Sequence, residues 1–241
     1  MEDMDYYEWE ESQKRFTFSK IIKFIFKFIC TLIIVGTFAL LLGRMTLMKI
    51  PKAYTAVTLT DGITQTLENG TFDAVMQEPV EPFNDNGKDE NGVYQRGWYH
   101  ISNVAVSKAA GEVQLTVRYN SRSTVSTLME KYSLTEPPSG ELFVYVLSDN
   151  EGNVYTDYVF AAKKRPLYEF RRVIFTGIDL SEAKALDLDV YWIDDVSKDG
   201  LMNANFTIYD TTFESETADE EMLKGKNLTF NKAPEYISNL D

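Results

Sequence analysis

Few residues of this chain have the type and spacing needed for covalent chemistry. His100 is the single histidine, and the single cysteine, Cys30, lies inside a long apolar run. A zinc site needs three or four ligands, so one built from histidine and cysteine is excluded. A Ser-His-Asp triad would have to use His100, and a lone histidine is more often an ordinary surface or strand residue. We therefore expect no catalytic residue, no metal and no cofactor.

Two pairs of carboxylates remain as candidates for acid-base chemistry. Asp187 and Asp189 alternate with leucines, so they share one face of a predicted strand, and Asp194 stands next to Asp195. Two such groups in one cleft could act as a general acid and its partner. An exposed strand face explains the same pattern without chemistry. A membrane-tethered hydrolase is therefore one alternative function, and not the leading one.

Two further groups of residues could bind a partner. The segment KKRPLYEFRR concentrates positive charge in an acidic region, and its candidate patch for an acidic partner is Lys163, Lys164, Arg165, Arg171 and Arg172. Charge balance within the acidic surface of the domain is the competing interpretation. Three aromatic residues could form a platform that stacks on sugar rings, namely Trp98, Tyr99 and Trp192. Aromatics at strand spacing are more often core residues, so a carbohydrate-binding module is a second alternative.

The most apolar segment is KIIKFIFKFICTLIIVGTFALLLGRM, residues 20–45. Counted from Phe24, it gives a helix about 30 Å long, which matches the hydrocarbon core of a bilayer. Lysines near a helix end can extend to the headgroups. The residues expected at the membrane interface are Lys20, Lys23 and Lys27 on one flank and Arg44 on the other. We expect a transmembrane helix over residues 20–48.

The same run is a poor cleaved signal and a poor core helix. Thr37 and Ala39 are small enough for a cleavage site, but no polar segment precedes the cut. A helix buried in a soluble protein usually keeps a polar face, and residues 28–42 have none. Basic residues are more frequent on the N-terminal flank, which predicts a cytoplasmic N-terminus and an extracytoplasmic C-terminal domain. The expected location is the plasma membrane, with a single span.

The net charge restricts the partners of the exported part. The chain has a formal net charge of −13, which argues against nucleic-acid binding because that needs a basic surface. Residues 53–241 contain 31 acidic and 16 basic residues, so the acidity lies beyond the apolar run. A surface of that sign is expected to be repelled by anionic lipid.

Beyond the run, the hydrophobic pattern has mainly a period of two. In EVQLTVRYN, Val113, Leu115 and Val117 fall on one face, and LDLDVYWID alternates in the same way. The sequence DNEGN predicts a hairpin turn. Further strands are expected at 53–60 and 167–178, a short helix at 123–132, and a helical turn at DLSEAKA capped by Ser181. About eight strands punctuated by turns predict an antiparallel β-sandwich.

The stretch ELFVYVLSDNEGNVY, followed by FRRVIFTGIDLSEAKALDLDVY, resembles the immunoglobulin-like domains of small membrane-anchored proteins of Gram-positive bacteria. The resemblance covers residues 97–209 and rests on turn and core residues. It implies a mainly β, immunoglobulin-like sandwich after one N-terminal transmembrane helix, and it carries no catalytic motif. This chain lacks the cysteine at the membrane boundary that lipid-anchored members use.

These patterns divide the chain into five parts. They are an acidic and aromatic, then basic, cytosolic tail (1–19), the transmembrane helix (20–48), a stem and irregular lead-in (49–92), the sandwich core (93–213) and an acidic C-terminal tail (214–241). The leading hypothesis is a single-pass membrane protein that presents the sandwich to another protein of the cell envelope. Such a protein would be an accessory subunit without chemistry of its own.

Overall fold

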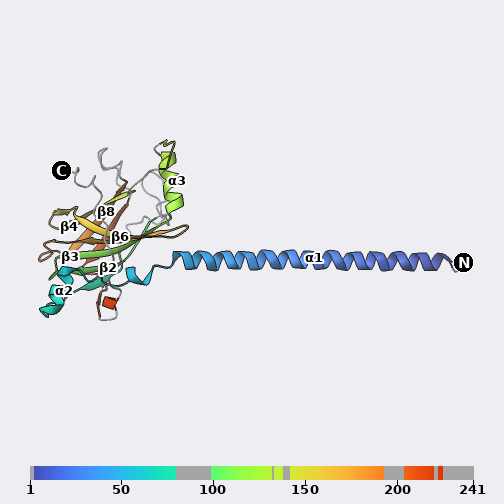
Figure 1. Ribbon diagram of the computed structural model, residues 1–241, viewed down its shortest axis with the longest axis horizontal. Helices are drawn as coiled ribbons and strands as arrows, with labels where there is room; N and C mark the ends of the chain where they lie inside the picture. Colours follow the sequence, from blue (N-terminus) through green and yellow to red (C-terminus); the bar gives the residue numbers. More distant parts are fainter. Residues whose placement is uncertain are drawn as a thin grey trace. The chain divides into compact units, whose positions relative to one another are not determined.

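The structure is a computed structural model that describes residues 3–79, 99–131, 133–137, 142–192, 204–219 and 222–224. The chain forms two compact units, residues 1–49 and residues 50–241, and each is described by itself (Figure 1). In chain order, the elements are α1 (Asp3–Met48), η1 (Lys52–Tyr54), α2 (Asp61–Glu68), β1 (Val75–Gln77), β2 (Tyr99–Ser107), β3 (Glu112–Tyr119), α3 (Ser121–Lys131), β4 (Phe143–Asp149), β5 (Val154–Tyr155), β6 (Tyr158–Lys164), β7 (Glu169–Phe175), β8 (Ala185–Trp192), β9 (Ala204–Asp210), β10 (Glu216–Thr217) and η2 (Met222–Lys224).

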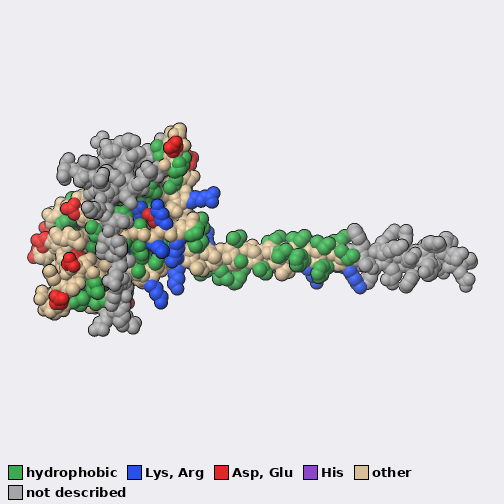
Figure 2. All heavy atoms as spheres, viewed as in Figure 1, with side chains coloured by type: hydrophobic (Ala, Val, Ile, Leu, Met, Phe, Trp, Pro, Cys, Tyr) green, Lys and Arg blue, Asp and Glu red, His purple; other side chains and the backbone are tan. Residues whose placement is uncertain are grey.

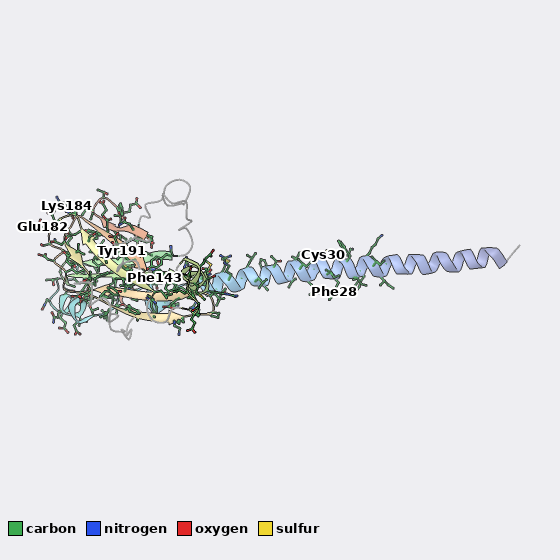
Figure 3. All side chains as sticks on the ribbon, turned by 90° about the horizontal axis from the view of Figure 1, so that it is seen from above. Phe28, Cys30, Phe143, Glu182, Lys184 and Tyr191 are labelled. Atoms are coloured by element: carbon green, nitrogen blue, oxygen red, sulfur yellow. The ribbon has the colours of Figure 1, made fainter. Side chains whose placement is uncertain are left out.

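The first unit is the helix α1. Its stretch Lys20–Met48 has 29 residues and is, within the described part of the chain, the one helix long and apolar enough to cross a membrane. Its apolar side chains are exposed, with Phe24 71% and Leu40 77% accessible. Figure 3 shows Phe28 and Cys30 projecting from this helix. An exposed apolar helix near the N-terminus is consistent with a signal anchor or a signal sequence, and it is not the packed helix of a soluble core.

The second unit contains two antiparallel sheets packed as a β-sandwich. Among the described residues, sheet A has the strand order β10-β1-β2-β3-β7-β6 and sheet B the order β5-β4-β8-β9. All strand pairs in both sheets are antiparallel. The antiparallel sandwich predicted from the sequence is therefore confirmed. Its immunoglobulin-like topology remains a prediction.

The main core lies between the two sheets. Val113, Leu115 and Val117 of β3 are fully buried there, as are Leu186 and Leu188 of β8. Because successive side chains of a strand point to opposite faces, the period-two pattern of the sequence identified this buried face correctly. The hairpin predicted at DNEGN is also present, since β4 pairs with β5 across it. The predicted helix after β3 is α3.

A second, smaller core lies on the other side of sheet A. It joins Val57, Ile63 of α2, Ala74, Ala105 of β2 and Leu223 of η2. Leu223 is 7% exposed, and β10 pairs with β1 at the edge of sheet A. The segment after Phe213 was expected to be an acidic tail. Ala218 and Leu223 are instead buried in this second core, so this part of the segment packs against the folded domain.

Two local predictions were wrong. Residues 53–60 form η1 and an irregular extended segment rather than a strand, because no neighbouring strand pairs with them. No helix forms at 179–185. There, Asp179 accepts hydrogen bonds from the backbone N–H (3.1 Å) and the hydroxyl (2.7 Å) of Ser181. Ser181 therefore donates its hydroxyl proton within an Asp turn, and it does not cap a helix.

Candidate functional site

The segment that follows α1 is fastened to the outer face of sheet A. We call residues 50–60 the strap. The side-chain amide of Gln114 on β3 accepts a hydrogen bond from Thr58 N–H (2.8 Å) and donates one to Thr58 C=O (2.9 Å). Thr116, two residues along the same face, donates its hydroxyl proton to the carbonyl of Tyr54. Two buried polar side chains of β3 thus take the place of a neighbouring strand for the strap.

Arg172 of β7 completes this network from below the strap. Its side chain is fully buried and donates to the carbonyl of Asn103 (2.8 Å), the hydroxyl of Thr116 (3.2 Å) and the amide oxygen of Gln114 (3.0 Å). No carboxylate among the described residues pairs with it, and burial lowers the pKa of this guanidinium to about 9. The guanidinium stays charged at neutral pH, and neutral oxygens alone compensate it.

The far end of the strap is held by Glu112. Both carboxylate oxygens lie 2.7 Å from the hydroxyl of Thr60, and Thr60 caps α2 by accepting from Ile63 N–H at 3.1 Å. Burial raises the pKa of Glu112, while the hydrogen bonds from Thr60 and Gln114 oppose that shift. The strap, α2 and sheet A are therefore joined through one row of β3 residues: Glu112, Gln114 and Thr116.

The structure separates the five residues predicted to form a basic patch. Arg171 and Arg172 lie on opposite faces of β7, and both are buried, so neither belongs to a surface patch. The tip of the β6–β7 hairpin keeps the other three. Lys163 and Lys164 are exposed, and Arg165 is half-buried with its guanidinium 5.1 Å from the centre of the Phe170 ring. The sequence could not separate these two groups because it does not show what covers each face of β7.

Arg171 belongs to a buried ion pair. Its Nε and Nη2 lie 2.9 and 2.7 Å from Oε1 of Glu169, and Nη2 donates to the hydroxyl of Tyr119 at 2.8 Å. The guanidinium also lies 5.1 Å from the centre of the Phe160 ring. These contacts satisfy a charge at the margin of the sandwich core, where an unpaired arginine would be costly.

Of the three aromatic residues predicted to bind sugars, Tyr99 is the one whose side chain the structure describes. Tyr99 is buried, stacks on Tyr119 with ring centres 6.3 Å apart, and contacts Phe143 edge-on at 5.0 Å. Its ring is a core residue and is not available to a glycan. Trp98 lies outside the described residues, and Trp192 is described only as the last residue of β8.

The acidic pairs and the histidine have ordinary strand surroundings. Asp187 accepts from the hydroxyl of Thr207 (2.7 Å), and Asp189 accepts from the amide of Asn205 (2.5 Å), so both carboxylates bond to the neighbouring strand β9. Asp194 and Asp195 lie outside the described residues. His100 is half-buried opposite Arg118, and burial together with this arginine lowers the pKa of the imidazole.

One cleft of about 840 Å³ opens beside the edge of sheet A. Its lining comes from β1 and Glu78, from Asn103 in the irregular part of β2, and from residues 213–216. Three of its side chains are acidic: Glu78, Glu214 and Glu216. Within the described residues, no group of three or more His, Cys, Asp or Glu side chains is placed to hold a metal ion. The cleft is therefore lined by three carboxylates.

Comparison of the chain with protein-family models, with curated proteins and with solved structures gives no match. We therefore infer the function of the chain from its sequence and from the geometry of the described residues. Of the residues described above, the row of β3 that holds the strap is the feature that sequence reasoning missed. The polar alternation Glu112, Gln114, Thr116 was visible, but it also fits a solvent-exposed strand face.

Proposed function

We propose that this chain is a single-pass membrane protein that keeps α1 as its anchor and uses the sandwich to bind another protein of the cell envelope. In this role it is an accessory subunit without chemistry of its own. The proposal includes the orientation expected from the basic N-terminal flank, with the sandwich outside the plasma membrane.

The observation that carries the proposal is the short connection between the two units. α1 ends at Met48, and Tyr54 is already buried in the domain. Five residues connect them, and a connector of that length reaches at most about 20 Å. Because the strap after it is fixed to β3 by Gln114 and Thr116, no long flexible stalk follows the apolar helix. A domain held in this way suits contact with a neighbouring membrane protein better than capture of a distant target.

The finer family assignment is part of the same proposal. The hairpins and the sequence pattern around β4, β5, β7 and β8 support a relationship with immunoglobulin-like domains of membrane-anchored bacterial proteins. An experimental structure, compared strand by strand with such domains, would test it. A strand order unrelated to theirs would remove the family assignment and leave the membrane-anchored sandwich unchanged.

Affinity purification of the full chain from detergent-solubilised membranes tests the function. We expect one envelope protein to be recovered in an amount comparable to the chain itself. The matched control keeps residues 1–49 and carries an unrelated folded domain in place of residues 50–241. If the chain recovers nothing beyond what this control recovers, binding by the sandwich is contradicted.

A further inference from the structure

The charged side chains of the sandwich are divided between its two ends. The β2–β3 turn and the β4–β5 turn lie at the same end. Gly111 accepts from Ile178 N–H, just after β7, and Asn150 N–H donates to Ala185, the first residue of β8. The β6–β7 hairpin tip lies at the opposite end of sheet A, because β7 pairs Phe175 with Val113 and Glu169 with Tyr119. The backbone hydrogen bonds and the strand register therefore define two opposite ends of the sandwich from contacts within residues 50–241.

One end is basic and the other is acidic. The basic end consists of the hairpin tip and the beginning of the strap: Lys52, Lys163, Lys164 and Arg165. The acidic end carries five carboxylates at strand ends and in turns, and two lysines, Lys108 and Lys184, lie among them. The carboxylates are Asp149, Glu151, Asp179, Glu182 and Asp210. Figure 2 shows lysine and arginine side chains gathered at one end of the domain, and acidic ones over the other end and also at α3. Figure 3 shows Glu182 at the outer margin of the domain, beyond Tyr191 and Phe143.

The basic end presents its charge to solvent. The side chain of Lys164 is 82% exposed, and its contact with the buried Glu169 is long at 3.8 Å. Lys52 and Lys163 are exposed as well. Because Glu169 is already bonded to Arg171, the lysines at the tip are not neutralised by it. These cations are therefore available to a negatively charged surface.

The covalent chain indicates which surface that is. Lys52 follows the last residue of α1 by four residues, a reach of at most about 14 Å. A charge that close to a bilayer is within about one to two Debye lengths of its headgroups. The strap runs along β3 from Tyr54 beside Thr116 to Thr60 beside Glu112, so it begins toward the Tyr119 end of that strand. Lys163, Lys164 and Arg165 lie at this same end of sheet A, because β7 pairs Glu169 with Tyr119. No comparable covalent link favours a protein partner for this end.

We propose that the basic end of the sandwich binds the anionic headgroups of the membrane that α1 spans. The domain as a whole is acidic, and its sequence alone predicts repulsion from such a surface. Segregation of the charges changes that expectation, because anionic lipid would attract the end that contains Lys52, four residues after α1 in the chain, and would repel the acidic end. The two together orient the sandwich with the acidic end directed away from the membrane.

The test follows the distance between the hairpin tip and the lipid by energy transfer. The full chain with Cys30→Ser receives one donor dye at Pro166→Cys, beside the basic end. It is reconstituted in phosphatidylcholine vesicles with or without phosphatidylglycerol, each carrying an acceptor dye on lipid headgroups. We expect stronger transfer in the anionic vesicles and loss of the difference at high salt. A donor at Val154→Cys, at the β4–β5 turn, should show no such gain.

Substitutions of the lysines test whether they cause the stronger energy transfer in anionic vesicles. Each basic side chain near an anionic surface is worth about fivefold in binding, so Lys163→Gln with Lys164→Gln should lower the ratio of bound to unbound domains about 25-fold. Lys108→Gln with Lys184→Gln makes the same charge change at the acidic end and should have no effect. Equal transfer in both kinds of vesicle would overturn the proposal. So would transfer that rises only when an acidic membrane protein is added, since the basic end would then bind protein.

Discussion

The side-chain carboxamide of Gln114 accepts from the N–H of Thr58 at 2.8 Å and donates to its C=O at 2.9 Å. It thus bonds the two backbone groups that a neighbouring strand would bond in a sheet. The same amide oxygen accepts from Arg172 at 3.0 Å. One side chain therefore connects the strap, β3 and β7. The strap depends on this residue, together with Thr116, for its attachment to sheet A.

Replacing Gln114 by leucine should weaken the whole domain. Gln114→Leu leaves the buried polar groups of Thr58 and one donor of Arg172 without partners, and we expect the free energy of unfolding to fall by about 3 kcal/mol or more. Chemical denaturation of the full chain in detergent measures this. Gln65→Leu makes the same change on the exposed side of α2 and should alter stability by less than about 0.5 kcal/mol. Equal effects of both variants would show that the strap is not held by Gln114.

The buried carboxylate of Glu112 predicts a dependence of stability on pH. Its folded-state pKa is raised above the ordinary value of 4.5, mainly by burial. Folding therefore raises the affinity of this carboxyl for its proton, and the stability that the group contributes at low pH is lost as the pH rises through the folded pKa. Glu112→Gln removes this titration, so the variant should gain stability relative to the native chain between about pH 4 and about pH 7.

Denaturation of both proteins at the two pH values measures that difference, in which the titration of other groups cancels. Gln can still bond Thr60, so the cap of α2 should persist in the variant. A difference that stays constant with pH would contradict the raised pKa of Glu112. A stability advantage of the variant that shrinks toward neutral pH would mean that the pKa of Glu112 is lowered rather than raised.

The ion pair of Arg171 and Glu169 can be tested by a double-mutant cycle. Glu169→Gln alone leaves the buried guanidinium without a charged partner, so it should cost about 3 to 5 kcal/mol of unfolding free energy. Glu169→Gln combined with Arg171→Met removes both charges and should recover much of that loss. Additive losses in the double variant would mean that the two side chains do not act as a pair.

The parts of the fold that alternate regularly could be predicted, and the parts held by single side chains could not. Val113, Leu115 and Val117 show their buried face in the sequence because each points the same way from one strand. The strap also alternates in hydrophobicity, but its partner is an amide 56 residues away, which no local pattern reveals.

The burial of three of the predicted binding residues could not be read from the sequence for the same reason. Arg171 and Arg172 read as surface cations because arginine is rarely buried, yet β7 lies inside sheet A and is covered on both faces at these positions. Tyr99, the first residue of β2, was likewise predicted to contact a ligand, but it is buried because Tyr119 and Phe143 pack against it. Charge and aromaticity were visible in the sequence, but their burial depended on contacts between distant strands.

The anchor assignment predicts what becomes of the N-terminus. If α1 is retained, the membrane-bound protein should have the intact mass of the full chain, and high salt or alkali should not release it. Lys20→Glu, Lys23→Glu and Lys27→Glu together leave Lys14 and Arg15 as the cations of the N-terminal flank. The basic excess of that flank is then lost, so the orientation should reverse or become mixed. Protease treatment of intact cells measures this, since the native sandwich should be cleaved from outside. A shortened chain would identify α1 as a cleaved signal sequence.

Changing the length of the connector tests whether the sandwich binds its partner as a subunit held close to the membrane. A flexible glycine-serine segment inserted between Lys49 and Ile50 leaves both units intact but frees the sandwich from the membrane surface. The matched control carries the same segment after Asp241. If the domain works as a subunit held beside its membrane partner, recovery of that partner should fall with the first insertion and stay unchanged with the second. Equal recovery from both chains would show that the short attachment to α1 has no part in the function.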